Sequence, residues 1–223
     1  MTAGSTYFHA KSGAHRTPLQ LNPLSAGAIC LSVVELIPES YVAPIDPAKV
    51  FGRTAPLQVD LGCGDGDLVV AMAGRHPEKN FLGIERMSGR VAKTSRKALK
   101  LPNVRVLHVE TSYAIRYLLP ENSVEIFYLL FPDPWPKRRH HERRVVSSEF
   151  LDSIVRALEP NGLFHVATDQ KDYFEQIERI ASDKTRLRTI ECDIDLPVTT
   201  FQRRFQEQGM PIYRLSLRKN VPR

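Results

Sequence analysis

Short apolar runs alternate with helical patterns from residue 57 onward, and this alternation is the feature that most limits the fold. The runs lie at residues 57–61, 80–85, 104–110, 124–130 and 163–168. Strands that follow one another through helices predict a parallel sheet with helices on both faces. Two later runs, at residues 187–194 and 212–217, are expected to pair as an antiparallel edge. The predicted fold class is therefore α/β.

Three of the helical segments have enough periodicity to place their faces. Between the second and third strands, one face carries Met87, Val91, Ala98 and Leu101, and another carries Arg86, Arg90, Lys93, Lys97 and Lys100. The basic face is interpreted as solvated surface. A second helix is expected over residues 147–159, ended by Pro-Asn-Gly at residues 160–162, and a third over residues 172–181.

The first 56 residues differ from the rest, because prolines are scattered through them and no periodicity is sustained. We therefore divide the chain into an irregular N-terminal arm, residues 1–56, and a domain of residues 57–223. Short apolar runs such as residues 28–37 are expected to dock the arm on the domain. With 223 residues, 42% of them hydrophobic, the chain is long enough for one domain with such an appendage.

Composition argues against several classes of protein. No run approaches about 18 consecutive apolar residues and no signal peptide is evident, so we predict no membrane span and a cytoplasmic location. Cys30, Cys63 and Cys192 are isolated, which argues against a disulfide framework and a zinc site and suits a reducing compartment. No metal is implied, since His140 and His141 are adjacent within a basic run.

A glycine-rich turn follows the first strand, at the place where open α/β sheets bind cofactors. Residues 59–67 read VDLGCGDGD, with glycines at Gly62, Gly64 and Gly66 and acids at Asp60, Asp65 and Asp67. The spacing Gly-x-Gly-x-Gly is not that of dinucleotide binders, and three acids are a poor cradle for a pyrophosphate. They suit a positively charged cofactor without phosphate, which describes S-adenosylmethionine. A purely structural turn is the alternative.

Two further acids are expected at the same edge of the sheet. Glu85 ends the second strand nineteen residues after Gly66, the offset at which an acid commonly accepts hydrogen bonds from ribose hydroxyls. Glu110 closes the third strand and is expected to reach an adenine amino group, with a solvated acid at a strand end as the alternative. The glycine turn and Glu85 together predict a cofactor site.

An acid between two prolines follows the fourth strand. Residues 131–144 read FPDPWPKRRHHERR, and Pro132 and Pro134 stiffen the backbone on either side of Asp133. Because the carboxyl ends of parallel strands face the ligand crevice, Asp133 is expected to project beside the glycine turn. Trp135 is the single tryptophan, and it either stacks on a base or covers the edge of the core.

Seven basic or imidazole side chains follow within nine residues: Lys137, Arg138, Arg139, His140, His141, Arg143 and Arg144. In the whole chain, 31 Lys and Arg outnumber 25 Asp and Glu. Beside a cofactor crevice, this charge predicts binding to a phosphate backbone. Ordinary solvated surface is the alternative.

Five motifs together resemble the bacterial tRNA (guanine-N7-)-methyltransferases. They are DLGCGDG at residues 60–66, GIE at 83–85, FPDPWPK at 131–137, ATD at 167–169 and TTFQRR at 199–204. The resemblance runs from about Leu57 to the C-terminus. It implies the Rossmann-like class I methyltransferase fold, in which a mostly parallel seven-stranded sheet has an antiparallel last strand. It also implies methylation of a guanine in the tRNA variable loop, with S-adenosylmethionine converted to S-adenosylhomocysteine.

The resemblance also implies roles for particular residues. The family's cofactor residues fall on Asp60, Glu85, Glu110 and Asp133, beside Gly62, Gly64 and Gly66. Its substrate residues fall on Lys137, Asp169, Thr199, Thr200, Phe201 and Gln202, and Arg204 is expected to add a contact to the RNA. Three positions depart from the family pattern. Asp60 stands where Glu is frequent and Glu110 where Asp is usual, whereas Gln202 replaces the usual Glu and loses a charge.

The chemistry limits what the acids have to do. Guanine N7 carries a lone pair and no proton, so we expect Asp133 to orient groups and stabilise charge, and not to take a proton. Asp169 is expected to accept from the guanine N1–H or amine, with a helix cap as its alternative. Phe201 is either an RNA contact or a core residue.

Two other functions remain open at this point. One is another nucleic-acid or amino-group methyltransferase of the same fold, and the other is a non-catalytic RNA-binding protein on that scaffold. The expected partner is tRNA, and the chain is expected to be a monomer or a homodimer.

Overall fold

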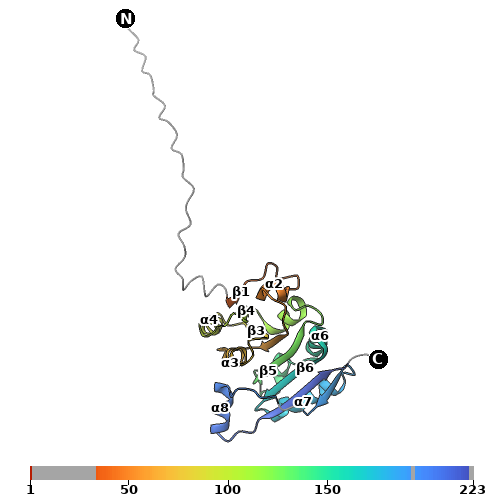
Figure 1. The fold of residues 1–223 in the computed structure, drawn as a ribbon. Helices are drawn as coiled ribbons and strands as arrows, with labels where there is room; N and C mark the ends of the chain where they lie inside the picture. The colour runs from red at the N-terminus through yellow and green to blue at the C-terminus, as the bar shows by residue number, and fades with distance from the viewer. Residues whose placement is uncertain (2–33, 192–193, 221–223) are drawn as a thin grey trace.

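The computed structural model describes residue 1 and residues 34–191 and 194–220 (Figure 1). Cys30 and Cys192 lie outside the described residues, as do residues 2–33 of the predicted arm and the side chains of Phe201 and Arg204. The interpretations made for them therefore stay predictions.

Eight strands of the described chain form one sheet in the order β1-β4-β3-β2-β5-β6-β8-β7. Their bounds are β1 (Glu35–Leu36), β2 (Leu57–Leu61), β3 (Asn80–Glu85), β4 (Val104–His108), β5 (Val124–Leu130), β6 (Leu158–Thr168), β7 (Leu187–Ile190) and β8 (Tyr213–Lys219). Neighbours from β1 to β6 run parallel, whereas β8 runs antiparallel to both β6 and β7. The predicted mostly parallel sheet with an antiparallel last strand is confirmed, and β1 adds a short eighth strand.

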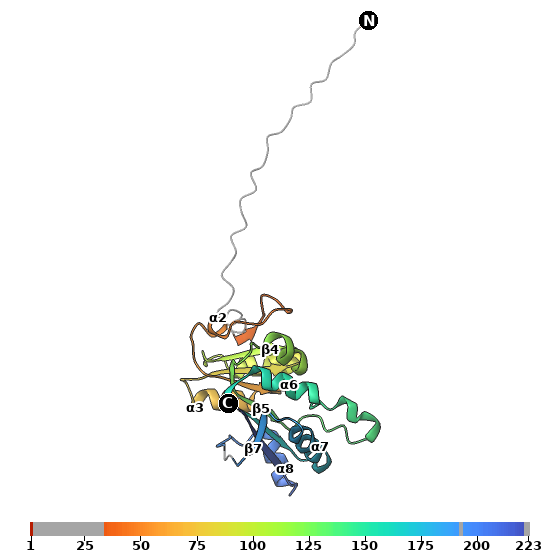
Figure 2. The ribbon, with the colours of Figure 1, turned by 90° about the vertical axis from the view of Figure 1, so that its right-hand side faces the viewer.

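Helices cover both faces of this sheet, as Figures 1 and 2 show from two sides. α3 (Asp67–Arg75) and α4 (Ser88–Lys97) pack on one face, and α6 (Ser148–Ala157) and α7 (Lys171–Ser182) pack on the other. Every residue of β2 and β3 is buried, as strands between two helical layers require. No helix in the described part of the chain is long and apolar enough to cross a membrane.

Five shorter helices were not predicted from the sequence. They are α2 (Pro47–Phe51), α5 (Thr111–Tyr113), the π-helix η1 (Ala114–Leu118), the 3-10 helix η2 (Arg138–Arg143) and α8 (Thr200–Glu207). Each is at most eight residues long, which is too short to establish a clear helical period in the sequence.

The predicted inner face of α4 is partly correct. Val91 and Ala98 are buried, and Leu101 packs at the margin of the same core. Met87 is 51% exposed, because it precedes the first turn of the helix and turns toward a cavity at the edge of the sheet. The apolar pattern therefore describes the helix body but not its N-terminal end.

The Pro-Asn-Gly sequence at residues 160–162 does not end α6, so this prediction is wrong. The helix stops at Ala157, and β6 begins at the next residue. Residues 160–162 lie inside β6 at a shift of register, where Val124 pairs with Leu158 but Ile126 pairs with Leu163. The turn residues therefore make an irregularity within the strand, a usual role for glycine in a sheet.

The described part of the predicted arm packs on the domain. β1 pairs with β4, and α2 is capped by Asp46, whose side chain accepts from the backbone of Ala48 at 2.9 Å. Ile45 and Phe51 belong to the main hydrophobic core. Pro47 begins a helix here, where its missing N–H costs nothing. Residues 34–56 are therefore not irregular throughout, and the boundary at residue 57 stays a prediction.

Candidate active site

The glycine turn between β2 and α3 has a backbone conformation that only glycine adopts easily. The φ angle is 74° at Gly62, 57° at Gly64 and 80° at Gly66, all in the left-handed region. The turn is also pressed against α4, since a Cβ on Gly66 would lie 2.4 Å from Cγ2 of Thr94. The Thr94 hydroxyl donates to the Gly64 carbonyl oxygen at 3.0 Å. α4 therefore fixes the shape of the turn.

Gly66→Ala is expected to lower the free energy of unfolding by about 2–4 kcal/mol, because it adds left-handed backbone strain to a steric overlap with Thr94. Urea unfolding followed by circular dichroism measures the loss. The control is Gly74→Ala in α3, where a Cβ would meet nothing within 4 Å and stability should stay equal or rise by up to about 1 kcal/mol. Equal stability of the two variants would contradict the steric argument.

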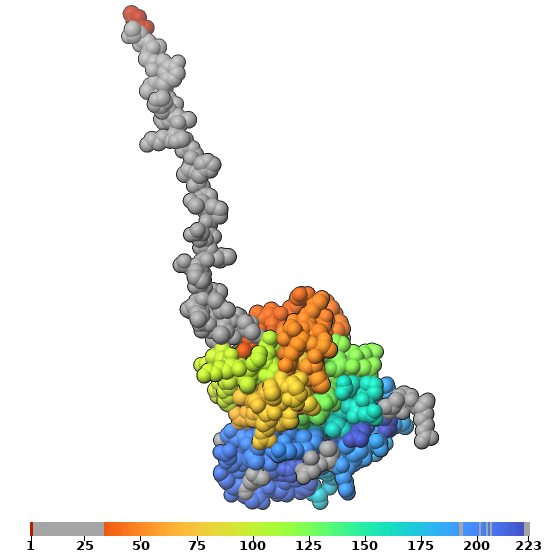
Figure 3. Space-filling model, in the orientation of Figure 1, coloured from red at the N-terminus to blue at the C-terminus, as the bar shows by residue number. Residues whose placement is uncertain are grey.

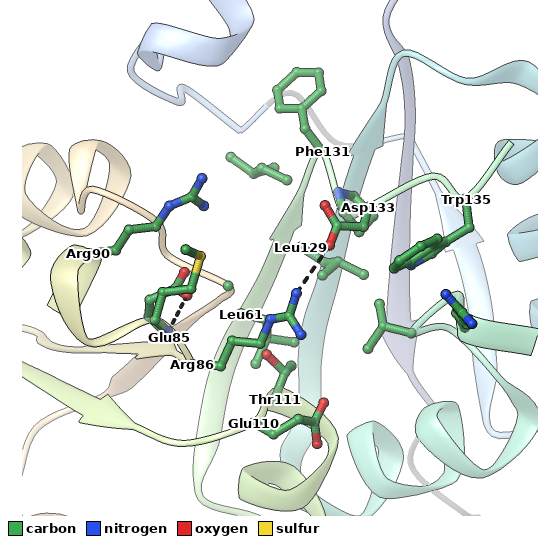
Figure 4. Close-up of a pocket in the computed structure, with 16 residues that line it drawn as sticks. Leu61, Glu85, Arg86, Arg90, Glu110, Thr111, Leu129, Phe131, Asp133 and Trp135 are labelled. Carbon is green, nitrogen blue, oxygen red and sulfur yellow. Dashed lines mark hydrogen bonds and ion pairs between the residues drawn. The ribbon is translucent and has the colours of Figure 1, made fainter. Parts of the chain in front are cut away.

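Glu85, at the end of β3, ties the glycine turn to the start of α4. One carboxylate oxygen accepts from the backbone N–H of Gly64 at 3.1 Å, and the other accepts from that of Met87 at 2.8 Å. The side chain is buried, yet it borders a cavity (Figure 4). Each oxygen can accept a second hydrogen bond, so Glu85 has the capacity to hold two hydroxyl groups of a ligand.

Asp60 is a buried carboxylate without a hydrogen-bond donor. No donor group in the described part of the chain reaches its side chain, which lines a cavity beside the glycine turn. Burial, together with the nearby charge of Glu85, raises the pKa of Asp60 to about 7. A buried acid that lacks partners is destabilising unless a ligand supplies them. A cationic group in the cavity would do so.

The other two acids of the turn already have partners, which the sequence patterns did not reveal. Lys93 donates to Asp65 at 3.1 Å, and Lys97 donates to Asp67 at 2.6 Å. The basic face of α4 is therefore not only a solvated surface, because two of its lysines neutralise the turn. Of the three acids in the turn, Asp60 alone is left without a partner within the described residues.

Two cavities meet at the carboxyl edge of the sheet. The larger, about 620 Å³, is bordered by Glu85, Met87, Glu110 and Trp135, and the smaller, about 360 Å³, by Asp60, the glycine turn and Thr200. Both are lined by Gly62, Arg90, Leu130, Phe131 and Asp133. The shared lining makes them two halves of one crevice, with Asp133 at the junction.

Asp133 projects from the loop after β5, as predicted. Its side chain is 73% exposed, and Nη2 of Arg86 lies 3.7 Å from its Oδ2 across the larger cavity (Figure 4). The loop is rigid at its base, because the N–H of Phe131 donates to the carbonyl oxygen of Ala167 at 2.7 Å. Phe131 and Trp135 both have positive φ, 52° and 42°, which non-glycine residues keep only under strong local constraint.

The basic segment after Trp135 folds back over its ring. The Arg143 guanidinium lies 5.1 Å from the ring centroid, and the His140 ring meets it edge-on at 5.9 Å. Lys137, Arg138 and Arg139 are exposed, and the segment stands out from the body (green, at the right of Figure 2). Arg144 differs, because its side chain is only 1% exposed. It is unavailable to RNA, so including it in the RNA-binding run was wrong.

Glu110 lies beyond the end of β4 and borders the larger cavity. It caps α5, because its carboxylate accepts from the N–H groups of Ser112 at 3.0 Å and Tyr113 at 2.8 Å.

Asp169 follows β6, and its carboxylate accepts from the Gln170 side chain at 2.6 Å. The N-cap residue of α7 is Gln170. Asp169 is therefore not a helix cap, which was the alternative role considered for it. Lys137 and Asp169 are not among the lining residues of the two cavities.

The segment at residues 199–202 reaches the crevice through the start of α8. The hydroxyl and N–H of Thr200 both donate to Asp67, and the buried Thr199 accepts from the N–H of Gln202 at 3.2 Å. Figure 3 shows the C-terminal part of the chain (blue) directly below the yellow residues that follow β2. Phe205 packs on Phe131, with ring centroids 5.1 Å apart. α8 therefore contacts both the glycine turn and the Asp133 loop.

Sequence reasoning missed Arg86 and Arg90 as crevice residues. Arg90 lines both cavities, and its guanidinium lies near the glycine turn. The signal was present, since Arg86 directly follows Glu85 and Arg90 lies four residues farther on. Arg86 lies just before α4 and Arg90 lies in its first turn, at the edge where the strands end, which distinguishes them from the lysines farther along the helix.

Comparison with known proteins agrees with this geometry. A family described as "Putative methyltransferase" matches residues 54–215. The tRNA (guanine-N(7)-)-methyltransferase of Idiomarina loihiensis is 34% identical over 185 residues, 79% of this chain and 76% of the relative. That of Syntrophotalea carbinolica is 35% identical over 191 residues, 82% of each chain.

Among solved structures, the 16S rRNA methyltransferase KamB has a similar fold, with a TM-score of 0.59 and 17% identity. The alignment covers 78% of this chain and 92% of KamB. At this identity the likeness concerns the fold alone, which is that of a class I methyltransferase. On the strength of the family match and of relatives at 34–35% identity over most of their length, the chain belongs to the tRNA (guanine-N(7)-)-methyltransferase family.

Proposed function

We propose that this chain transfers a methyl group from S-adenosylmethionine to N7 of a guanine in the variable loop of tRNA. The observation that carries the proposal is that two cavities meet at Asp133, beside an exposed basic segment. One crevice can then hold a cofactor while the RNA backbone lies along its rim. Family membership supports the same reaction.

The residues of the crevice are chemically suited to S-adenosylmethionine. Asp60 offers a buried carboxylate without a partner to an ammonium group, and Glu85 has spare acceptors for ribose hydroxyls. Arg90 lines both cavities and can pair with a carboxylate. The exposed side chain of Met87 offers an apolar surface for an aromatic base. Glu110 has both oxygens engaged by backbone N–H groups, so its proposed contact to adenine needs a second lone pair.

The reaction requires alignment more than proton transfer. When bound, the cofactor supplies a methyl group. The N7 lone pair forms the new bond to its carbon, and the electron pair of the broken bond stays on the sulfur. Since N7 loses no proton, the residues at the junction have to hold the base in line and stabilise the cationic product. Asp133, exposed at the junction of the two cavities, is the acid in a position to do so.

The RNA is proposed to lie across the exposed basic segment and the start of α8. Lys137, Arg138 and Arg139 would contact phosphates. Asp169 and the segment at residues 199–202 would contact the guanine and its neighbours, with Gln202 contributing an amide in place of a charge. These roles follow from the resemblance and from the position of α8 at the crevice.

Removing two charges from the segment, with Arg138→Gln and Arg139→Gln together, is expected to weaken tRNA binding. The slope of log affinity against log salt should become shallower by about one to two units, because fewer counterions are released. Affinity for S-adenosylmethionine should stay within about twofold. Filter binding of tRNA at several salt concentrations measures the affinity for tRNA and its salt slope.

The control for this experiment is Lys49→Gln, which removes the charge of an exposed side chain in α2 that lines neither half of the crevice. It should leave the salt slope unchanged. An equal change of slope in the control and in the double variant would argue against a specific backbone contact.

The proposed function is tested by transfer of labelled methyl to unmodified tRNA, followed by chemical cleavage at 7-methylguanine. Cleavage at one variable-loop position is the expected result. Label in adenine or in protein would instead support a different methyltransferase of the same fold. Binding of tRNA without binding of S-adenosylmethionine would support a non-catalytic protein. The expected cytoplasmic location and the choice between monomer and homodimer stay predictions.

A further inference from the structure

Arg144 is buried although it ends a run of exposed basic residues. Its side chain is 1% exposed, and its guanidinium is held on every side. Nε donates to the carbonyl oxygen of Pro134 at 2.8 Å, Nη1 donates to the side chain of Gln176 at 2.6 Å, and Nη2 pairs with Asp172. The group also lies 4.6 Å from the ring centroid of Tyr173.

These contacts join three parts of the chain. Pro134 directly follows Asp133, so the bond from Arg144 closes residues 134–144 into a loop whose two ends are held together. Asp172, Tyr173 and Gln176 all belong to α7, which packs on the sheet through buried Tyr173 and Ile177. The Tyr173 hydroxyl also accepts from the N–H of Val146 at 3.2 Å, just after the loop. The loop on this side of the crevice is thereby fastened to α7 and to the core.

Stability alone is a weak reason for such a group. The Asp172 side chain is 55% exposed, and an ion pair with an exposed partner contributes only about 1 kcal/mol or less. The planar guanidinium fork can, however, bind a carbonyl, an amide and a carboxylate at once in fixed directions, which a lysine ammonium cannot do. This chemistry suits a residue that sets geometry.

We propose that Arg144 is a positioning residue for methyl transfer. It holds the loop that carries Asp133 and Trp135 in a fixed position relative to the crevice. The proposal rests on the proposed function for the reaction that is positioned. Arg144 does not touch the substrate, and it acts through the carbonyl oxygen of Pro134 and through α7. The bond to Pro134 fixes the peptide next to Asp133, and the closed loop fixes the exposed basic segment that would contact the RNA.

The test is Arg144→Lys, which keeps the charge and loses the fork. We expect kcat for tRNA methylation to fall by about 10- to 100-fold at a temperature where the variant is folded, since misplacement by about 1 Å is worth that much. Affinity for S-adenosylmethionine should stay within about twofold. Trp135 is the single tryptophan, so its fluorescence reports the loop directly. Its emission should shift to the red and become more accessible to acrylamide.

The control is Arg156→Lys. Arg156 is also a partly buried arginine that donates to carbonyl oxygens, those of Ile115 at 2.6 Å and Leu119 at 2.9 Å, but it lines neither half of the crevice. We expect this variant to lose stability while kcat and Trp135 emission stay as in the wild type. If Arg144→Lys behaves in the same way, with lower stability only, the positioning role is overturned.

The two proposals can fail separately. If the wild-type protein transfers no methyl group to tRNA, the proposed function fails, whereas the emission and quenching of Trp135 still report whether Arg144 holds the loop. Unchanged emission in Arg144→Lys overturns the positioning role whatever the substrate proves to be.

Discussion

Asp133→Asn is expected to lower kcat for tRNA methylation by about 10²- to 10³-fold, the usual effect of removing one group that stabilises charge in a transition state. The rate that remains should stay flat between about pH 6 and 9 at saturating S-adenosylmethionine, because N7 gives up no proton. Single-turnover methylation over this pH range makes the measurement. The amide keeps the shape of the side chain, so the loss reports its charge.

The control for Asp133 is Glu142→Gln, which removes an exposed acid that lines neither half of the crevice. Its kcat should stay within about twofold of the wild type. A different result for Asp133 would change the mechanism. If the wild type shows a steep acid limb near neutral pH and Asp133→Asn abolishes it, Asp133 is a base.

Asp60→Asn is expected to weaken binding of S-adenosylmethionine by about 10- to 100-fold at about pH 8, since a charged hydrogen bond contributes roughly 1.5–3 kcal/mol. In the wild type, the pKa of Asp60 is about 7, so the carboxyl has to lose a proton to pair with an ammonium group. Affinity should therefore rise with pH up to about 7 and level off above it. Titration calorimetry in buffers of different ionisation enthalpy would detect the released proton, which the variant should not release.

Without cofactor, Asp60 should make the folded protein less stable as the pH rises. Its pKa is raised from 3.8 to about 7, so between these values the folded protein holds a proton that the unfolded chain has lost. The free energy of unfolding then falls with rising pH, by up to about 4 kcal/mol over the whole window. The Asp60→Asn variant has no carboxyl group at this position, so its free energy of unfolding should not fall for this reason. Relative to the wild type it should gain stability between pH 5 and pH 8 in urea unfolding.

Asp65→Asn is the matched control for Asp60→Asn, because Asp65 lies in the same turn but is exposed and paired with Lys93. It should change neither the pH dependence of binding nor that of unfolding. A constant difference in stability between Asp60→Asn and the wild type at both pH values would mean that Asp60 is not protonated in the folded protein.

Local patterns were enough to predict most of the sheet and the position of several crevice residues. The bounds of β2, β3 and β5 match the apolar runs, since β2 and β3 are buried from end to end and β5 is buried at four of its seven residues. Because parallel strands present their carboxyl ends at one edge, knowing where β2, β3 and β5 stop also located the glycine turn, Glu85 and Asp133. The order and direction of the strands were therefore sufficient to predict these positions, and no knowledge of tertiary contacts was needed.

Contacts between distant segments could not be predicted in this way. Arg143 and Arg144 are adjacent and chemically identical, yet one stacks over Trp135 on the surface and the other is buried against α7. That difference depends on where α7 lies. Likewise, Asp65 and Asp67 looked as available as Asp60 until α4 brought Lys93 and Lys97 against them. Such partnerships arise only when the helices pack.

The two edges of the sheet limit how copies of this chain can associate. An exposed strand with unpaired backbone groups is a template for aggregation, which proteins avoid with short or charged edge strands. At one edge, the two residues of β1 cover part of β4. At the other, β7 is four residues long and carries the exposed side chain of Arg188. Any self-association is therefore expected to use helix or loop surfaces and not to extend the sheet from one molecule to the next.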